Sequence, residues 1–154
     1  MNARKIFEMM AGVWKINRRI LNSQSKFTRG DGIATFKMKE NDENAMLYRE
    51  ELTLYAHFDK ISASKEYIFR YKEDDTISVY FNEKPERFFY TLNFPQLETG
   101  KSNINVAGGE HLCGNDLYLA EYVFVDYNQF QLSYQVNGPQ KNYRLVTLYD
   151  RESF

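Results

Sequence analysis

Apolar and polar residues alternate along most of this chain, which is the pattern of β-strands with one face turned towards a core. The clearest case is a run in which Phe130, Leu132, Tyr134 and Val136 alternate with polar residues. The same pattern, bounded by short polar turns, predicts ten strands: 13–21, 32–39, 45–55, 61–72, 77–81, 88–94, 105–113, 116–126, 129–136 and 141–151. The stretch 22–31 is predicted to be a loop, because only Phe27 in it is a large apolar residue.

A short helix precedes the strands. Asn2 is a suitable N-cap for a helix over residues 3–11, and Gly12 ends it. Sequential strands with tight turns leave no room for parallel crossovers. We therefore predict an all-β fold, an antiparallel up-and-down barrel of about nine or ten strands with the helix plugging one end. A β-sandwich is the alternative.

The first predicted strand places a charge on its apolar face. Trp14, Ile16, Arg18 and Ile20 share one face, since alternate residues of a strand point the same way. A buried guanidinium cannot lose its proton, so it must find acceptors inside the fold. Glu50, which alternates with apolar residues on the third strand, is a candidate partner.

Length and composition narrow the class of protein. At 154 residues and 43% hydrophobic content, the chain is predicted to form a single domain, residues 1–154. A net charge of -1 gives no reason to expect nucleic acid as a partner. The lone Cys113 excludes an internal disulfide, and no apolar run approaches a membrane span. We expect a cytoplasmic protein.

The helix followed by Gly12-Val13-Trp14 resembles the opening of the calycins, the superfamily of lipocalin and fatty-acid-binding barrels. In that superfamily the tryptophan packs near the closed end against a basic residue from a late strand, and both Arg144 and Arg151 are placed to be that residue. A wider pattern is similar to an uncharacterised bacterial family of calycin-like domains. The pattern comprises Gly12-x-Trp14 with Arg18, Tyr48-x-Glu50, Tyr67, His111-x-Cys113-x-x-Asp116-x-Tyr118, and Gly138-Pro139-x-Lys141-x-Tyr143 running on to Tyr149 and Arg151. The resemblance implies the barrel fold and no particular activity.

The predicted interior is unusually polar. It combines four cations, two carboxylates and a set of tyrosines: Arg18, Lys65, Lys141, Arg151, Glu50, Asp116, Tyr48, Tyr67, Tyr71, Tyr90, Tyr118, Tyr134, Tyr143 and Tyr149. One interpretation is a cavity whose cations hold an anionic group and whose tyrosines supply aromatic walls. The other is a network that fills the barrel, with Arg18 paired to Glu50 and Lys141 to Asp116.

One hairpin gathers residues that could form a site. If Gly114-Asn115 is a two-residue loop, Cys113 lies opposite Asp116 and His111 opposite Tyr118. The set lacks a fourth metal ligand and matches no standard zinc motif, so we expect no metal and no cofactor. Residues two apart on a strand are too distant for His111 to activate Cys113. A hydrogen-bonded rim is the better interpretation, and His111 as an axial haem ligand is a further alternative.

The first functional hypothesis is a barrel that binds a small anionic aromatic or acyl compound. Its candidate ligand-binding residues are Arg18, Tyr48, Glu50, Lys65, Tyr67, His111, Cys113, Asp116, Tyr118, Lys141, Tyr143, Tyr149 and Arg151. The second is a cofactor-independent lyase, isomerase or hydrolase, with catalytic candidates Glu50, Tyr67, His111 and Asp116. There Arg18 would orient a carboxylate, Glu50 would act as acid or base, and Tyr48 or Tyr67 would donate a proton. The third is a protein-interaction module.

The strand 116–126 predicts a contact surface. If its tyrosines face inwards, Leu117, Leu119, Val123 and Val125 lie together outside, and a monomer rarely leaves such a patch in water. We expect a homodimer through this face. The alternative is that the helix or the 95–103 loop covers it.

Overall fold

The fold consists of one helix and ten strands. The computed structural model describes residues 2–22, 24, 27–56, 58–94 and 105–151. The elements are α1 (Ala3–Met10), β1 (Gly12–Asn22), β2 (Phe27–Lys39), β3 (Asp42–Ala56), β4 (Asp59–Lys72), β5 (Thr76–Phe81), β6 (Arg87–Leu92), β7 (Asn105–Cys113), β8 (Asp116–Asp126), β9 (Gln129–Asn137) and β10 (Asn142–Asp150).

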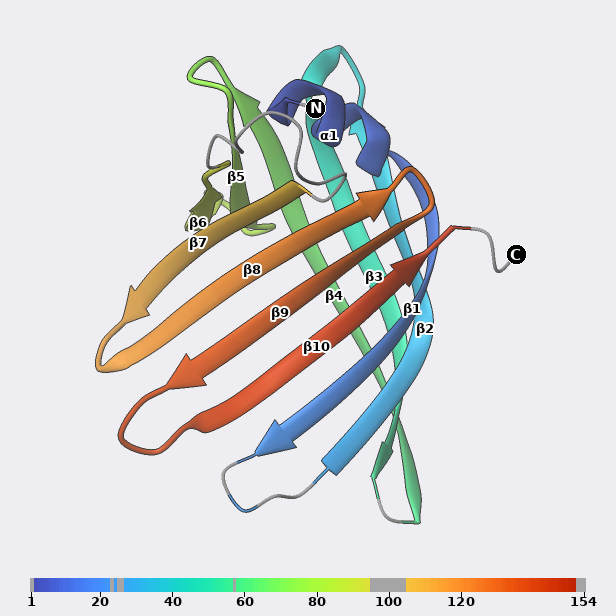
Figure 1. Cartoon of the computed structure of the whole chain (residues 1–154), viewed down its shortest axis with the longest axis vertical. Helices are drawn as coiled ribbons and strands as arrows, with labels where there is room; N and C mark the ends of the chain where they lie inside the picture. The colour runs from blue at the N-terminus through green and yellow to red at the C-terminus, as the bar shows by residue number, and fades with distance from the viewer. Residues whose placement is uncertain (1, 23, 25–26, 57, 95–104, 152–154) are drawn as a thin grey trace.

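All ten strands belong to one antiparallel sheet in the order β6-β5-β4-β3-β2-β1-β10-β9-β8-β7. The first strand pairs with the last, so the sheet curls into a barrel (Figure 1). Among the described residues, the edge strands β6 and β7 are joined by a single isolated bridge between Asn93 and Gly108. The predicted antiparallel up-and-down barrel is confirmed, and it is nearly closed.

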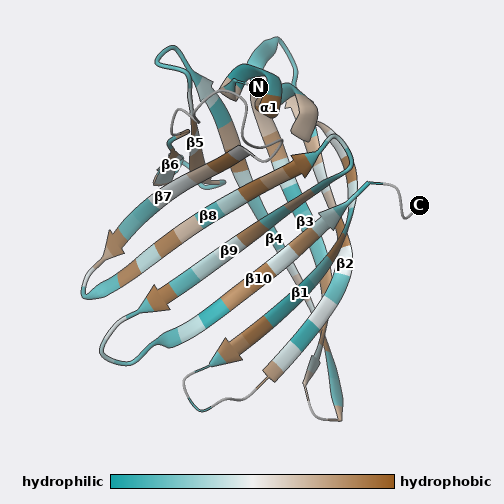
Figure 2. Ribbon diagram, in the orientation of Figure 1, coloured by the Kyte–Doolittle hydropathy of each residue, from teal (hydrophilic) through white to brown (hydrophobic). Residues whose placement is uncertain are grey.

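The strands follow the predicted alternation of faces. Figure 2 shows hydrophobic and hydrophilic residues alternating along β8, β9 and β1. The inward residues Trp14, Ile16, Phe130 and Tyr149 are buried in one continuous core. The apolar periodicity of the sequence therefore fixes which face of each strand enters the barrel.

The predicted loop over 22–31 is partly wrong, because β2 begins at Phe27. The first half of β2 contains glycines and charged residues. This half nevertheless pairs with β1 on one side and with β3 on the other. A side chain at Gly32 could not be accommodated, since its Cβ would lie 1.9 Å from the Glu51 carbonyl oxygen. Strand pairing on both edges thus outweighs the weak local β-propensity of this segment.

The helix α1 lies across one end of the barrel (Figure 1). Asn2 caps it as predicted, its side chain accepting a hydrogen bond from the Lys5 amide at 2.9 Å. The apolar face of α1, which includes Ile6, Phe7 and Met10, is fully buried in the core. Within the described residues, none of the helical structure has the length and apolar character needed to span a membrane.

Arg151 holds the end of this helix against Trp14. Its guanidinium lies 4.0 Å from the centre of the Trp14 ring and donates hydrogen bonds to the Met9 and Ala11 carbonyls, the latter at 3.0 Å. Arg144 is exposed on β10 and takes no part. Of the two candidate basic residues, Arg151 is therefore the one that packs on the tryptophan.

We predict that Arg151→Ala lowers the free energy of unfolding by about 2 kcal/mol, because it removes a cation–π contact and leaves helix-end carbonyls without donors. The measurement is urea denaturation followed by tryptophan fluorescence. Arg144→Ala is the matched control, and we expect it to change stability by less than about 0.5 kcal/mol. Equal losses in the two variants would contradict the assignment.

Candidate functional site

The interior is built around an ion pair between β1 and β3. The guanidinium of Arg18 donates to both oxygens of Glu50, from Nη1 to Oε2 at 2.6 Å and from Nη2 to Oε1 at 2.8 Å. Arg18 Nε donates to the Thr147 hydroxyl on β10 at 2.9 Å. Both charged side chains are almost entirely buried, with exposed fractions of 11% and 7%. The prediction that each finds a partner inside the barrel is confirmed.

Two tyrosines extend this pair into a directed chain. The Tyr48 hydroxyl donates to Glu50 Oε1 at 2.7 Å and lies 2.8 Å from the Tyr149 hydroxyl. A hydroxyl has one proton, so Tyr149 must donate to Tyr48. We call Arg18, Glu50, Tyr48, Tyr149 and Thr147 the central network.

Small residues on the intervening strand allow the ion pair to form. β2 lies between β1 and β3, and Gly30 and Ala34 are the β2 residues directly beside Arg18 and Glu50. Neither carries a side chain long enough to fill the space above the sheet. The Arg18 side chain can therefore reach across β2 to the carboxylate.

The network sets the ionisation states of its members. Burial alone would raise the pKa of the Glu50 carboxyl, but the hydrogen bonds from Arg18 and Tyr48 hold that pKa below its usual range. Burial would lower the pKa of the Arg18 guanidinium, and Glu50 more than reverses this. The pair is therefore fully ionised at neutral pH, and its two charges compensate each other.

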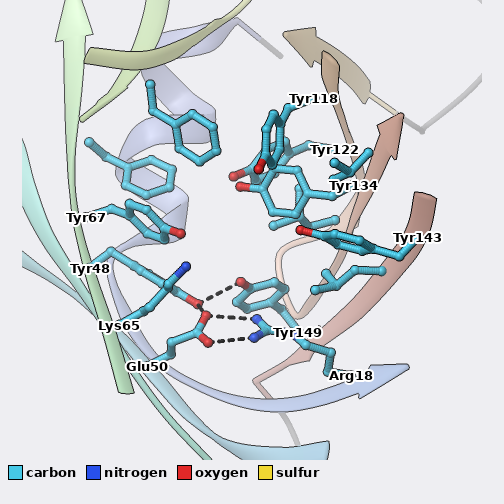
Figure 3. A pocket seen from close by; sticks show the side chains of 15 residues that line it. Arg18, Tyr48, Glu50, Lys65, Tyr67, Tyr118, Tyr122, Tyr134, Tyr143 and Tyr149 are labelled. Carbon is cyan, nitrogen blue, oxygen red and sulfur yellow. Dashed lines mark hydrogen bonds and ion pairs between the residues drawn. The ribbon is translucent and has the colours of Figure 1, made fainter. Parts of the chain in front are cut away.

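A cavity of about 120 Å³ lies beside the central network. Figure 3 shows tyrosines from several strands surrounding it. Its walls are formed by Arg18, Tyr48, Glu50, Lys65, Tyr67, Phe69, Phe89, Tyr118, Tyr122, Leu132, Tyr134, Val136, Tyr143, Leu145 and Tyr149. The predicted tyrosine-walled interior is thus present, and phenylalanine, leucine and valine side chains complete the walls.

Some polar groups on the wall make no direct hydrogen bond or ion pair with the other described residues of the protein. Within the described part of the chain, the Tyr67 and Tyr143 hydroxyls make no hydrogen bond and Lys65 makes no ion pair. Figure 3 shows Tyr67 and Lys65 on one side and Tyr143 on the other, with their polar atoms turned inwards. Burial raises the pKa of both tyrosines, so their hydroxyls stay protonated at neutral pH. All three groups can donate to a ligand.

Two other wall tyrosines, Tyr122 and Tyr134, are hydrogen-bonded to Tyr90, which does not line the cavity. The Tyr90 hydroxyl lies 2.7 Å from that of Tyr122 and 2.6 Å from that of Tyr134. Burial raises the pKa of Tyr122 and Tyr134, which keeps this cluster neutral. Tyr122 and Tyr134 therefore shape the cavity, whereas Lys65, Tyr67 and Tyr143 are the groups free to donate to a ligand.

The hairpin quartet forms the predicted register, and it lies at the rim. Cys113 is opposite Asp116 and His111 is opposite Tyr118. Only Tyr118 reaches the cavity wall, because His111 packs edge-on against Phe89 and Cys113 is exposed. In the described residues, no three histidine, cysteine or carboxylate side chains are grouped so as to hold a metal ion.

Asp116 and Lys141 join neighbouring hairpins at this rim. Their charged atoms are 3.9 Å apart, and Lys141 is exposed outside β10. A Cβ at Gly138 would lie 1.8 Å from Asp116 Oδ1, so the aspartate packs directly on that turn. The pairing of Lys141 with Asp116 matches the structural interpretation of these two residues.

Among the four cations expected inside, only Arg18 and Lys65 line the cavity. Arg151 is at the helix end, and Lys141 is at the rim. Periodicity assigned all four inwards because it cannot tell where a strand passes beyond the closed part of the barrel. The expected excess of interior positive charge is therefore reduced to Lys65, since Glu50 compensates Arg18.

The ligand-binding candidates chosen from the sequence omit seven of the fifteen residues that line the cavity. Those missed are Phe69, Phe89, Tyr122, Leu132, Tyr134, Val136 and Leu145. All of them except Phe89 lie in phase with inward residues, so alternation could have identified them. Phe89 could not be found in this way, because the register of β5 and β6 shifts between Val79 and Tyr80.

Comparison with known proteins identifies the family to which this chain belongs. The model of DUF6314, a family of unknown function, matches residues 10–151. The fold is similar to that of the S-type phycobiliprotein lyase CPES from Guillardia theta, with a TM-score of 0.66 and 10% identity over 100% of this chain and 94% of that chain. It is also similar to Rv2717c from M. tuberculosis, with a TM-score of 0.69 and 10% identity over 97% of each chain. No curated protein sequence matches. At these identities the likeness concerns the fold alone.

We predict that Arg18→Ala lowers the free energy of unfolding at pH 7 by on the order of 3 kcal/mol, because it leaves the Glu50 carboxylate buried without its cation. The Glu50 pKa is depressed in the folded state, so the stabilisation is present above the unfolded pKa of about 4.3 and is lost as pH falls through the folded value. The difference between Arg18→Ala and the original protein should therefore shrink below about pH 4.

The measurement is chemical denaturation at several pH values. The double variant Arg18→Met with Glu50→Leu is the control, and it should recover much of the loss because no charge is left unpaired. If Arg18→Ala lowered the free energy of unfolding only slightly and by the same amount at every pH, the result would contradict a buried ion pair in which each charge depends on the other.

Proposed function

This chain belongs to DUF6314, a family of unknown function, and we propose that it binds a small molecule in the barrel cavity. The ligand is a compact aromatic or acyl compound with a carboxylate or a similar anionic group. One observation carries the proposal: within the described part of the chain, Lys65, Tyr67 and Tyr143 line the cavity and make no hydrogen bond or ion pair, although the Lys65 charge also acts on the neighbouring Glu50. The two solved structures support the barrel architecture and leave the ligand to this chain's own residues.

The size of the cavity limits the ligand. A volume of about 120 Å³ is below the 300 Å³ or more typical of drug-sized sites. An apolar cavity of about 150 Å³ accommodates benzene. A single ring or a short acyl chain therefore fits, and the apolar side chains of Phe69, Phe89 and Leu132 suit it. A haem does not fit, and His111 is not on the wall.

The charge of the ligand follows from the free donors. The Lys65 ammonium can only donate, and the protonated hydroxyls of Tyr67 and Tyr143 are available as donors. A carboxylate accepts several such bonds at once and balances the lysine charge. Arg18 contributes little to this preference, because Glu50 already neutralises it.

The enzyme hypothesis gains no support from the geometry. Glu50 is ionised and receives three hydrogen bonds, so it is held in place rather than poised to exchange a proton. Arg18 uses three of its five N–H groups on Glu50 and Thr147. The catalytic roles suggested for these residues remain predictions, and binding is the function that we propose.

We predict that benzoate raises the melting temperature of the protein more than benzyl alcohol does, because only the acid carries a charge for Lys65. Lys65→Met should remove this preference, and Tyr67→Phe or Tyr143→Phe should weaken binding of benzoate by about tenfold each through loss of one hydrogen bond. The measurement is a thermal-shift titration followed by calorimetry.

Lys15→Met is the control, since Lys15 is exposed on the outer face of β1. Benzyl alcohol binding as tightly as benzoate would refute the anionic ligand. An equal effect of the Lys15 and Lys65 substitutions would refute the site.

The outer face of β8 supports the proposal of a homodimer. Leu119 and Val125 are exposed by 37% and 38%, and Leu117 and Val123 are half-buried on the same face. We predict that the chain sediments as a dimer at micromolar concentration and that Leu119→Glu makes it a monomer, because a charge would be buried in an apolar contact. Glu110→Gln, a change next to Leu119, is the control. A monomer unaffected by Leu119→Glu would contradict the proposal.

A further inference from the structure

The end of the barrel opposite α1 carries exposed apolar side chains that the cavity does not use. At this end the β1–β2 and β3–β4 hairpins extend away from the helix (Figure 1). Phe58 between β3 and β4 is fully exposed, and Phe27, Ile61 and Leu21 are about half exposed. We call these four residues the apolar tips. Phe58 has the most exposed large apolar side chain in the described part of the chain.

Basic side chains accompany the apolar tips. Arg19 and Arg29 are cross-strand partners on the outer face of the β1–β2 hairpin, and Lys60 lies beside Tyr55 on β3 and β4. Lys65 is further along β4. None of these four cations makes an ion pair within the described residues. At the ends of the hairpins, Arg19, Arg29 and Lys60 stand against Asp31 and Asp59, so these ends carry a small excess of positive charge. Further along β4, Lys65 is accompanied by Glu51 and Glu66 and adds nothing to this excess.

The arrangement fits a lipid surface better than a protein partner. The apolar tips form two small groups rather than one continuous face. Leu21 and Phe27 are cross-strand partners on β1 and β2, whereas Phe58 and Ile61 belong to the β3–β4 hairpin. A protein partner would need matching pockets for each of them, whereas the interface of a bilayer accepts separate apolar points at the depth of the headgroups. Unpaired arginine and lysine side chains at the same level are attracted to anionic lipids.

We propose that this end of the barrel docks reversibly on an anionic membrane surface. Phe58 and Phe27 enter the interface, while Arg19, Arg29 and Lys60 contact the lipid phosphates and carboxylates. Lys65 is exposed and lines the cavity, and it lies on the same strand as Ile61, so β4 connects the docked end with the cavity wall. The docking proposal does not depend on cavity binding, because none of the apolar tips lines the cavity.

The test is co-sedimentation of the full chain with vesicles of phosphatidylcholine alone and of phosphatidylcholine mixed with phosphatidylserine. We expect binding to the mixed vesicles, weaker binding to phosphatidylcholine, and release at high salt, because the charge attraction is screened. Phe58→Ser should weaken binding to the mixed vesicles by about tenfold through loss of one buried aromatic ring.

Matched variants separate docking from general effects on the surface. Phe88→Ser removes a phenylalanine that is 48% exposed on β6, and it should leave binding unchanged. Lys60→Glu should weaken binding, whereas Lys84→Glu, in the exposed turn between β5 and β6, should have little effect. Equal effects of the Phe58 and Phe88 substitutions, or no binding to mixed vesicles, would overturn the proposal. So would self-association that depends on Phe58 and occurs without lipid.

Discussion

The buried pair of Arg18 and Glu50 is the interaction on which the interior depends. Two ions taken out of water are costly to the fold unless each is matched by the other and by further hydrogen bonds. Here the carboxylate receives three hydrogen bonds and the guanidinium also reaches Thr147. The barrel must therefore bring β1, β3 and β10 to one register, which favours a single arrangement of its strands.

In the binding function that we propose, the same pair limits which groups can contact a ligand. Because its charges cancel, recognition falls to the donors next to it, Lys65, Tyr67 and Tyr143. Tyr122 and Tyr134, which are hydrogen-bonded through Tyr90, form part of the wall on the side of Tyr143 (Figure 3). A rigid polar network beside a small apolar space is how binding sites achieve specificity at low entropic cost. We infer that the network serves to preorganise the free donors.

The sequence was sufficient to predict the barrel, the helix cap and the buried ion pair, because each rests on local alternation or on the cost of burying charge. The predicted membership of a family of unknown function is also confirmed, and the solved structures confirm the barrel fold. The sequence did not place Lys141 and Arg151 correctly. Periodicity predicted that both side chains point inwards, but their strands had already reached the ends of the barrel. The start of β2 was missed because pairing with two neighbours, rather than its own residues, makes it a strand.

The central claim is that the cavity holds a small anionic molecule, and a crystal structure of the protein soaked with a bromine-labelled benzoate tests it most directly. The account predicts an anomalous bromine peak among the apolar walls of Phe69, Phe89 and Leu132, with the carboxylate facing Lys65, Tyr67 and Tyr143. A cavity that contains only ordered water at saturating benzoate would contradict it.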